Sequence, residues 1–522
     1  MMLLRCITAL VLSAYCISSM AESVSAKANG ELLMGELDND IAIYRGVPFA
    51  KAPINELRWQ APQPHTPRKG QQLATNFAPA CMQSPRLVEW YKDLVKGFDQ
   101  DPSVVQTPEF SEDCLHLNIW SPAQNKSKQL PVMVWIHGGS NSSGWSYEPN
   151  YLGHQLAKQE VIVVSIAYRV GVFGFFAHPE LSQQQNINTN FGLLDQIAAL
   201  QWIQQHINHF GGDANNITVF GESAGAANIS YLMASPLAKG LFHRAIHQSA
   251  GFEMLGHKTR KADEQRGIAL ATELNTKNLK QLRAVDANAL QTATDSVYQD
   301  HGFAPVIDGH VLTEEPIKTF ATQQQHPVSL MIGTNANEWY MYLDTDTDAK
   351  AVESYIEDNA SDEAQQPLKQ WASQQSDHQL ALDRLYSARE MLCPSIYIAK
   401  QVAAKQSSWV YYFSKERAGK AAATLKAYHG AEIPYAFDTH DEWLPTDNSD
   451  TALSQTMLRY WSNFAKTGNP NRQGLPNWPN YNPNYTANPS STSVMELGDN
   501  IGPIAMPEAL LCQWLSPIPP NQ

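Results

Sequence analysis

The sequence lacks the features that divide a long chain into separate domains. Its 522 residues contain no Pro-, Gly- or Ser-rich linker, no low-complexity tract and no internal repeat. Length alone would favour about three domains, yet the composition offers no boundary between them. With 43% hydrophobic residues, the chain has enough apolar side chains for a large core.

Positive charge is also scarce. The chain has 37 Lys and Arg against 51 Asp and Glu, which gives a formal net charge of −14. Nucleic acid phosphates and anionic membrane surfaces repel an acidic protein, so neither is an expected partner. We interpret the net charge as a feature that keeps the protein soluble.

Beyond the N-terminus the sequence has no apolar run long enough to span a membrane, and no membrane anchor is expected. At the N-terminus Arg5 is the only charge before Glu22, and residues 7–18 are mainly apolar. Ser19-Met20-Ala21 then fits a small-x-small cleavage site. Residues 1–21 are therefore predicted to be a secretory signal peptide, and the mature protein is expected to be secreted or periplasmic.

Cysteine is rare: the chain has six, and two of them leave with the signal peptide. The four that remain are Cys81, Cys114, Cys393 and Cys512. None of them has C-x-x-C spacing, which argues against a metal site. In an oxidising compartment they are expected to form disulfides. Four cysteines permit three pairings, and their spacing leaves the choice open.

The most informative segment is Val-Phe-Gly-Glu-Ser-Ala-Gly-Ala at residues 219–226. It places a G-x-S-x-G pattern between an apolar run and an expected helix, which is the setting of a nucleophile elbow. Gly221 and Gly225 lack Cβ atoms, so strand and helix can pack closely around a strained turn. Ser223 would then be exposed at the tip, beside a helix N-terminus that favours negative charge.

A second segment upstream fits the same chemistry. Residues 131–136 have the composition of a buried strand, and His137-Gly138-Gly139-Ser140 follows at once. Small residues at such a turn let backbone N–H groups approach a substrate oxygen, as an oxyanion hole requires. A glycine-rich turn without chemistry is the alternative for this run alone. The downstream motif at Ser223 favours the oxyanion hole.

Strand-like and helical patterns alternate along the chain. From Leu193 to Ile207 apolar residues recur at steps of three or four, which predicts a helix ending near Gly211. Strand-like runs are expected at residues 161–167, 217–220, 245–248, 329–333 and 409–413. Because strand–helix–strand order implies parallel pairing, we predict an α/β fold with a large, mostly parallel sheet flanked by helices.

Taken together, the motifs resemble the type B carboxylesterase family of the α/β-hydrolase superfamily, which includes the cholinesterases. Besides the two segments above, the resemblance is carried by residues 44–50, 111–120, 167–171, 190–196, 210–213, 305–309 and 466–470. It extends roughly from residue 28 to the end of the chain. The resemblance implies the α/β-hydrolase fold, with one domain over residues 22–522.

The resemblance also implies a catalytic triad of Ser223, Glu338 and His429. His429 begins an H-G-x-E loop and comes late in the chain, as the serine–acid–histidine order of this fold requires. Because a histidine base must be neutral, activity is expected to fall below about pH 6.5.

The acid of the triad has competitors. Glu338 follows the strand-like run at residues 329–333, although Trp339 stands where the family usually has glycine. Asp308 is the runner-up, but its surroundings are typical of a turn. Glu222, beside the nucleophile, is interpreted as a supporting residue.

The implied reaction is hydrolysis of a small-molecule carboxylic ester through an acyl-enzyme, with no metal or organic cofactor. Backbone N–H groups of Gly139, Ser140 and Ala224 are the expected oxyanion donors. Ser140 occupies a position that is often glycine in the family. The resemblance further implies disulfides Cys81–Cys114 and Cys393–Cys512 and ion pairs Arg58–Glu112 and Arg169–Asp195.

The substrate is less constrained. Cholinesterases hold a quaternary ammonium group against a tryptophan ten residues before the S-E-D-C cysteine, and here that position is Val104. We therefore predict a preference for neutral esters with short or medium acyl chains. The aromatic residues that flank the catalytic segments predict an aromatic-walled site; they are Trp145, Tyr147, Trp339 and Tyr340. Trp90 and Tyr91 either cover the site or only pack their own loop.

Other functions of this family remain open at this point. A lipase, an amidase or a cholinesterase-like hydrolase would use the same triad. Non-catalytic adhesion members generally lose a triad residue, whereas this chain retains all three. The six N-x-[ST] sequons are interpreted as incidental, because two of them flank the elbow; they are at Asn125, Asn141, Asn216, Asn228, Asn359 and Asn484.

Overall fold

The computed structural model describes residues 23–123, 129–183, 189–256, 259–299, 302–440, 443–482 and 492–517. The predicted signal peptide and the sequons at Asn125 and Asn484 lie outside these residues. Among the described residues, no helix is both long and apolar enough to cross a membrane.

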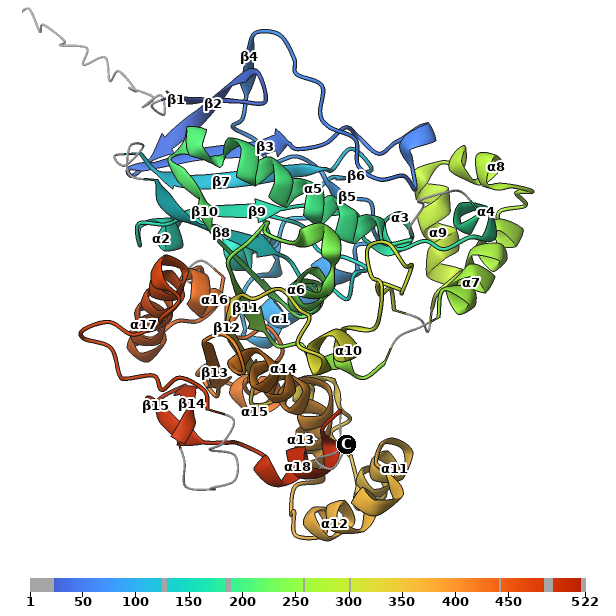
Figure 1. Cartoon of the computed structure of the whole chain (residues 1–522). Coiled ribbons are helices and arrows are strands. Elements are labelled where there is room, and N and C mark those ends of the chain that lie inside the picture. Colours follow the sequence, from blue (N-terminus) through green and yellow to red (C-terminus); the bar gives the residue numbers. More distant parts are fainter. Residues whose placement is uncertain are drawn as a thin grey trace, which may run out of the picture.

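A twisted central sheet of thirteen described strands runs through the molecule (Figure 1). In spatial order its strands are β1 (Ser23–Ala28), β2 (Glu31–Asp38), β3 (Ile41–Pro48), β7 (His116–Pro122), β9 (Ile162–Ile166), β8 (Leu130–Ile136), β10 (Gly212–Glu222), β11 (Arg244–Gln248), β12 (Ser329–Asn335), β13 (Ser408–Phe413), β14 (Thr492–Leu497) and β15 (Ile501–Ala505), with β4 (Gln71–Leu73) paired to β2. From β9 to β14 neighbouring strands are parallel. At both edges the pairing is antiparallel, except that β4 pairs with β2 in parallel. A separate two-stranded sheet joins β5 (Ala80–Cys81) to β6 (Phe110–Ser111).

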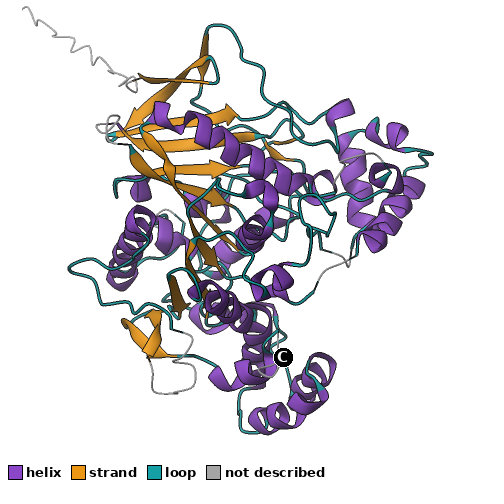
Figure 2. Cartoon of the chain, viewed as in Figure 1, coloured by secondary structure: helices purple, strands orange, loops and turns teal. Residues whose placement is uncertain are grey.

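Helices cover both faces of the sheet, and further helices lie beyond it (Figure 2). They are α1 (Arg86–Gly97), α2 (His154–Ala157), α3 (Gly171–Gly174), α4 (Pro179–Ser182), α5 (Phe191–His206), α6 (Ala224–Ala234), α7 (Arg260–Glu273), α8 (Leu279–Arg283), α9 (Ala287–Val297), α10 (Pro316–Ala321), α11 (Ala349–Asn359), α12 (Asp362–Ala372), α13 (His378–Ser387), α14 (Cys393–Ala403), α15 (Ala422–Leu425), α16 (Ile433–Phe437), α17 (Asn448–Thr467) and α18 (Ala509–Leu515). Figure 1 shows α7, α8 and α9 gathered with α4 at one end of the molecule.

Strand β8 shows how the sequence produces these layers. Successive side chains of a strand point to opposite faces. Val132 and Val134 accordingly join the hydrophobic cluster that contains α5 and α6, whereas Met133 and Trp135 join the cluster that contains α16 and α17. Because both faces are covered, nearly every position of β8 is apolar and buried. The predicted strands and the predicted helix correspond to β9–β13 and α5, and the predicted α/β fold with a large, mostly parallel sheet is confirmed.

Two disulfides tie distant segments to this core. Cys81 is joined to Cys114, and Cys393 is joined to Cys512, which anchors α18 beside the start of α14. These are the pairs that the family resemblance implies. Since one sheet connects β1 near the start of the described chain with β15 near its end, we infer that the described residues form a single domain.

Candidate active site

The segment around Ser223 forms a sharp turn between β10 and α6. Ser223 has φ +54° and ψ −125°, a backbone conformation that residues other than glycine rarely adopt. A Cβ atom on Gly221 would lie 2.5 Å from the carbonyl oxygen of Ile136, and one on Gly225 would lie closer still. Glycine is therefore required on both sides of the serine, as the elbow motif predicts.

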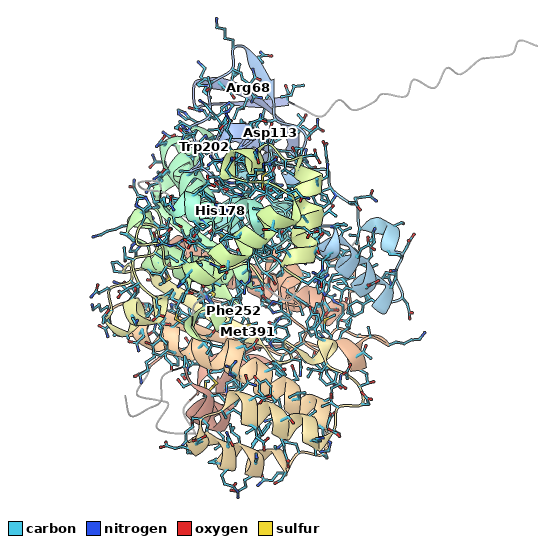
Figure 3. The ribbon with its side chains drawn as sticks, turned by 90° about the vertical axis from the view of Figure 1, so that its right-hand side faces the viewer. Arg68, Asp113, His178, Trp202, Phe252 and Met391 are labelled. Carbon is cyan, nitrogen blue, oxygen red and sulfur yellow. A yellow bond between two sulfur atoms is a disulfide. The ribbon has the colours of Figure 1, made fainter. Side chains whose placement is uncertain are left out.

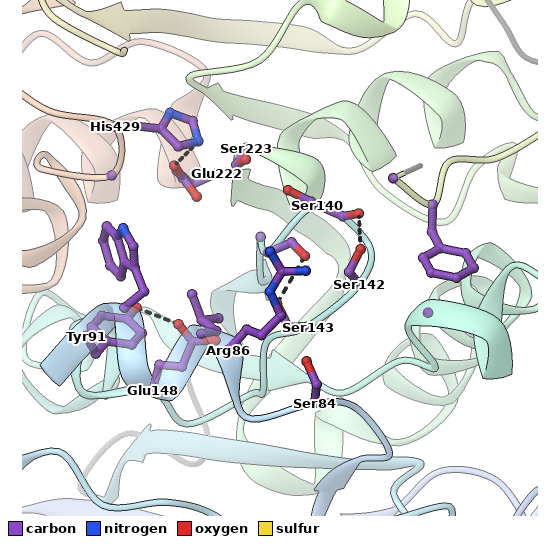
Figure 4. Close-up of a pocket in the computed structure, with 18 of the residues that line it drawn as sticks. Ser84, Arg86, Tyr91, Ser140, Ser142, Ser143, Glu148, Glu222, Ser223 and His429 are labelled. Atoms are coloured by element: carbon purple, nitrogen blue, oxygen red, sulfur yellow. Dashed lines mark hydrogen bonds and ion pairs between the residues drawn. The ribbon is translucent and has the colours of Figure 1, made fainter. Parts of the chain in front are cut away.

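The turn opens into a cavity of about 850 Å³ (Figure 4). Ser223, Gly139, Ser140 and His429 all line it. The structure thus brings together three segments that are far apart in the sequence: the elbow, the glycine turn after β8 and the loop before α16. The cavity lies where parallel strands end, which is where open α/β sheets bind ligands.

Glu338 and His429 form a short, partly buried hydrogen bond. The Nδ1 atom of His429 lies 2.7 Å from Oε2 of Glu338, whose side chain has no exposed surface. The other oxygen, Oε1, accepts a 2.7 Å hydrogen bond from the backbone N–H of Asn335 at the end of β12. Glu338 is therefore fixed on both oxygens, and it orients the imidazole with Nε2 away from the acid.

Glu222 occupies a position beside the same imidazole. Its Oε1 lies 3.2 Å from Nε2 of His429, and Figure 4 shows both residues grouped with Ser223 at one end of the cavity. Burial disfavours a charged imidazole, but the carboxylates of Glu222, Glu338 and Glu432 outweigh it and raise the pKa of His429 above its ordinary value. Burial also raises the pKa of Glu222, which the charge of His429 opposes.

The glycine turn after β8 is tightly wound. Gly139, Ser140 and Asn141 all have positive φ, at +95°, +56° and +54°. The carbonyl oxygen of Gly139 accepts hydrogen bonds from the N–H groups of Ser142 (2.9 Å) and Ser143 (3.0 Å). The carbonyl group of Gly139 is therefore bonded within the turn, and Gly139 and Ser140 line the cavity.

The sequence and the fold agree with known proteins. The model of the carboxylesterase family matches residues 24–502. The chain belongs to the carboxylesterase family. It is accordingly a carboxylic ester hydrolase, and the family assignment from the sequence motifs is confirmed.

Individual carboxylesterases match over most of their length. The para-nitrobenzyl esterase of Bacillus subtilis is 33% identical over 463 residues, which cover 86% of this chain and 90% of the relative. The liver carboxylesterase of Sus scrofa is 34% identical over 494 residues, covering 85% and 84% respectively. A solved structure of a PNB esterase superposes with a TM-score of 0.80 at 30% identity, over 95% of this chain and 99% of that one.

The wall of the esterase cavity differs from the sequence prediction. Of the four aromatic residues expected there, only Trp339 lines the cavity; Trp145 and Tyr340 are buried elsewhere, and Tyr147 stacks on Phe77. The aromatic lining comes instead from Trp90, Tyr91, Trp135, Tyr151, Phe252, Tyr298, Phe303 and Tyr342. Figure 3 labels Phe252 and, beside it, Met391, which also lines the cavity.

Trp90 and Tyr91 both line the cavity, so they do more than pack their own loop, although Tyr91 is buried in its wall. The indole N–H of Trp90 donates a 3.1 Å hydrogen bond to the hydroxyl of Tyr342, which lies in the short helix Tyr340–Tyr342. Tyr342 is 47% exposed and also lines the cavity, so this contact lies at the cavity rim. Val104, the position considered for a cation-binding ring, is on the surface and outside the lining.

Two further cavity residues escaped the sequence analysis. Glu148 is buried and accepts hydrogen bonds from the Tyr91 hydroxyl (2.5 Å) and the Trp145 N–H (2.9 Å). Burial raises the pKa of Glu148 to about 7, although these hydrogen bonds oppose the shift. Arg86, in the first turn of α1, extends its guanidinium into the cavity (Figure 4). A lone acid in the aromatic run at residues 145–151 was the available signal for Glu148.

The remaining predicted residues have structural surroundings. Arg58 is paired with Glu112 (Nε–Oε1 2.7 Å), and Arg169 is paired with Asp195 (Nε–Oδ2 2.7 Å), as the resemblance implies. Asp308 accepts the backbone N–H groups that follow it, at residues 310–312, which supports its interpretation as a turn residue.

Proposed function

We propose that this carboxylesterase hydrolyses neutral esters with Ser223 as nucleophile, His429 as general base and Glu338 as the acid of the triad. The observation that carries the proposal is the 2.7 Å Glu338–His429 hydrogen bond beside a serine held at a strained elbow. A serine becomes nucleophilic only when a positioned base accepts its proton. The geometry supports that role because Glu338 holds Nδ1 of His429, and Nε2 is then the ring nitrogen that faces the elbow, 3.2 Å from Glu222, the neighbour of Ser223.

The reaction begins when Ser223 Oγ attacks the ester carbonyl carbon and Nε2 of His429 takes the hydroxyl proton. The imidazolium that forms is stabilised by the buried Glu338 carboxylate. The alcohol then leaves with the proton from His429, and an acyl group remains on Ser223. Water, deprotonated by the same imidazole, attacks the acyl-enzyme and releases the carboxylic acid and free Ser223.

Negative charge on the carbonyl oxygen is stabilised by the backbone N–H groups of Gly139, Ser140 and Ala224. The N–H of Ala224 begins α6, whose helix dipole adds a favourable potential. Preorganised donors of this kind are the largest contribution to many acyl-transfer reactions; removal of one typically lowers kcat by about 10²–10³-fold.

The cavity supports a preference for neutral over cationic substrates. Arg86, an exposed residue of the lining, adds a positive charge to the cavity wall, and the raised pKa of Glu148, about 7, leaves that carboxyl partly protonated at neutral pH. Burial also raises the pKa of Glu222 and Glu390. Asp295, the other carboxyl of the lining, is exposed and bonded to the Gln291 amide, so a quaternary ammonium group lacks a buried partner of full negative charge. The aromatic lining suits the apolar part of an ester with a short or medium acyl chain.

We infer that the enzyme acts outside the cytoplasm. The N-terminal pattern of residues 1–21 fits a cleaved signal peptide. The two disulfides support an oxidising compartment, because such bonds persist there and are rare in the cytosol.

An active-site titration tests the assignment. The purified mature enzyme is incubated with a fluorescent organophosphonate, and the labelled peptide is identified by mass spectrometry. We expect one label per chain on Ser223, loss of ester hydrolysis in step with labelling, and no label in Ser223→Ala. A fully active Ser223→Ala enzyme would overturn the triad. Hydrolysis of an acylcholine at least tenfold faster than a matched neutral ester would overturn the substrate preference.

A further inference from the structure

Two of the sequon asparagines face each other behind the cavity. The side-chain amide of Asn228 donates a 2.9 Å hydrogen bond to Oδ1 of Asn141, and the amide of Asn141 approaches Oδ1 of Asn228 at 3.4 Å. Asn141 is 3% exposed and Asn228 has no exposed surface. Because both amide nitrogens are buried in this reciprocal pair, neither asparagine is available to a glycan, and another role must explain them.

The pair connects the two halves of the proposed oxyanion hole. Asn141 follows Gly139 and Ser140 in the glycine turn. Asn228 lies in α6, the helix whose first residue, Ala224, supplies the third proposed donor. The amide pair is therefore a direct side-chain bridge between the turn and the nucleophile helix.

The turn needs such a bridge because its backbone is strained. Ser140 and Asn141 are consecutive residues other than glycine with left-handed φ values. Conformations of this kind persist only when surrounding contacts fix them. Asparagine tolerates the left-handed region better than most residues, and its side chain is short enough to bond locally.

Neighbouring contacts fix the same bridge from both sides. The carbonyl oxygen of Asn141 accepts a 2.6 Å hydrogen bond from the N–H of Gly171, at the start of α3. Tyr168 has a side-chain hydrogen bond with Asn228 and also donates a 2.8 Å hydrogen bond to the carbonyl of His137 at the other end of the turn. The amide pair is thus the centre of a buried network that spans the turn.

We propose that the Asn141–Asn228 pair is a positioning device that holds the Gly139 and Ser140 N–H groups in register with Ser223. It acts on the developing oxyanion through the backbone and does not touch the substrate. The proposal rests on the proposed function, because it assigns a purpose to the pair only if the turn binds the oxyanion. Loss of the Asn141–Asn228 pair should weaken binding of the transition state and leave binding of the ester ground state nearly unchanged.

The experiment compares Asn141→Ala, Asn228→Ala and the double variant with the parent enzyme. Each single variant should lower kcat by roughly 10–100-fold, which does not exceed the effect of removing one oxyanion donor. Its KM should stay within about threefold of the parent value. The double variant should be no worse than the more affected single variant within about twofold, because the two residues act as one unit. A trifluoromethyl ketone, whose adduct with Ser223 carries an oxyanion, should lose affinity by the same factor as kcat/KM.

A matched pair of near-isosteric changes separates positioning from packing. Asn141→Asp keeps the oxygen that accepts the 2.9 Å bond from Asn228, whereas Asn228→Asp removes that donor and sets two acceptors against each other. We therefore expect Asn141→Asp to retain much more kcat than Asn228→Asp. Asn190→Ala is the control for simple destabilisation, since Asn190 is also fully buried but bonds Val306 and Asp308 instead.

The outcomes distinguish this proposal from the proposed function. If Ser223 fails to take up an organophosphonate in the parent enzyme, the catalytic assignment itself is wrong. If labelling is normal but the ketone binds the alanine variants as tightly as the parent, the positioning role is refuted. It is also refuted if the losses in kcat multiply in the double variant, or if Asn190→Ala changes kcat and ketone affinity as much as the amide-pair variants do.

Discussion

Replacement of Glu222 by glutamine should move the acid limb of the pH–rate profile to lower pH. In the parent enzyme Oε1 of Glu222 lies 3.2 Å from Nε2 of His429, the atom that must be unprotonated to accept the Ser223 proton in the proposed mechanism. The nearby carboxylates favour the imidazolium and raise the pKa of His429. The limb should therefore lie above pH 6.5, the value expected for an isolated histidine. Glutamine removes one of these charges and keeps the size of the side chain.

The size of the shift follows from the distance. At 3.2 Å and an effective dielectric constant of about 20, two full charges interact by roughly 5 kcal/mol. That figure is an upper bound, because the raised pKa of Glu222 means that it carries only part of its charge near neutral pH. Glu338 also remains bonded to Nδ1 at 2.7 Å in the variant. We therefore expect a decrease of about 1–2 pH units, or roughly 1.4–2.7 kcal/mol.

The assay is kcat/KM for a neutral short-chain ester between pH 5 and pH 10 at constant ionic strength. When each profile is normalised to its own plateau, kcat/KM of Glu222→Gln at a pH on the acid limb should be about tenfold or more above that of the parent. Glu390→Gln is the matched control, since Glu390 also lines the cavity but is not among the carboxylates named as raising the pKa of His429. A limb that stays in place, or moves to higher pH, would refute the electrostatic role of Glu222.

Three further outcomes are expected. Ser223→Ala should lower kcat by about 10⁴-fold or more with an unchanged thermal midpoint; substantial turnover in the pure variant contradicts the nucleophile assignment. Cys114→Ser should cost roughly 3–5 kcal/mol in urea unfolding, because the Cys81–Cys114 bond closes a segment with a sequence separation of 33; an unchanged midpoint in urea argues against that contribution. Trp90→Ala removes the rim contact with Tyr342 and should raise the ratio of kcat/KM for longer over shorter acyl chains by roughly tenfold, about 1.4 kcal/mol. An unchanged ratio would show that Trp90 does not limit the length of the acyl chain.

Local patterns in the sequence were sufficient for the framework. The apolar run of β8, the helical spacing of α5 and the glycine pattern around Ser223 each depend on residues close together in the chain, and each is found where it was predicted. Backbone sterics explain this success. Gly221 and Gly225 are required by a turn that the motif itself specifies, whatever surrounds it.

The walls of the cavity were decided by the tertiary structure. Trp90 and Tyr342 are separated by 252 positions in sequence and meet only because α1 and the loop after β12 fold over the same opening. Tyr147 stands close to the glycine turn in sequence, yet its ring turns away to stack on Phe77. Side chains on adjacent loops point in directions that local spacing does not determine.

The charges and the polar bridge of the site depend on tertiary structure for the same reason. The raised pKa of His429 requires three carboxylates, those of Glu222, Glu338 and Glu432, to converge on one partly buried ring. The amides of Asn141 and Asn228, 87 positions apart, look like two unrelated sequons until β8 and β10 pair in parallel and bring the turn against α6. The sequence alone determined which backbone turns and chemical groups the protein has, because these obey local rules. Only the folded chain determined which of those groups share a buried environment, because desolvation and Coulomb interactions depend on distance in space.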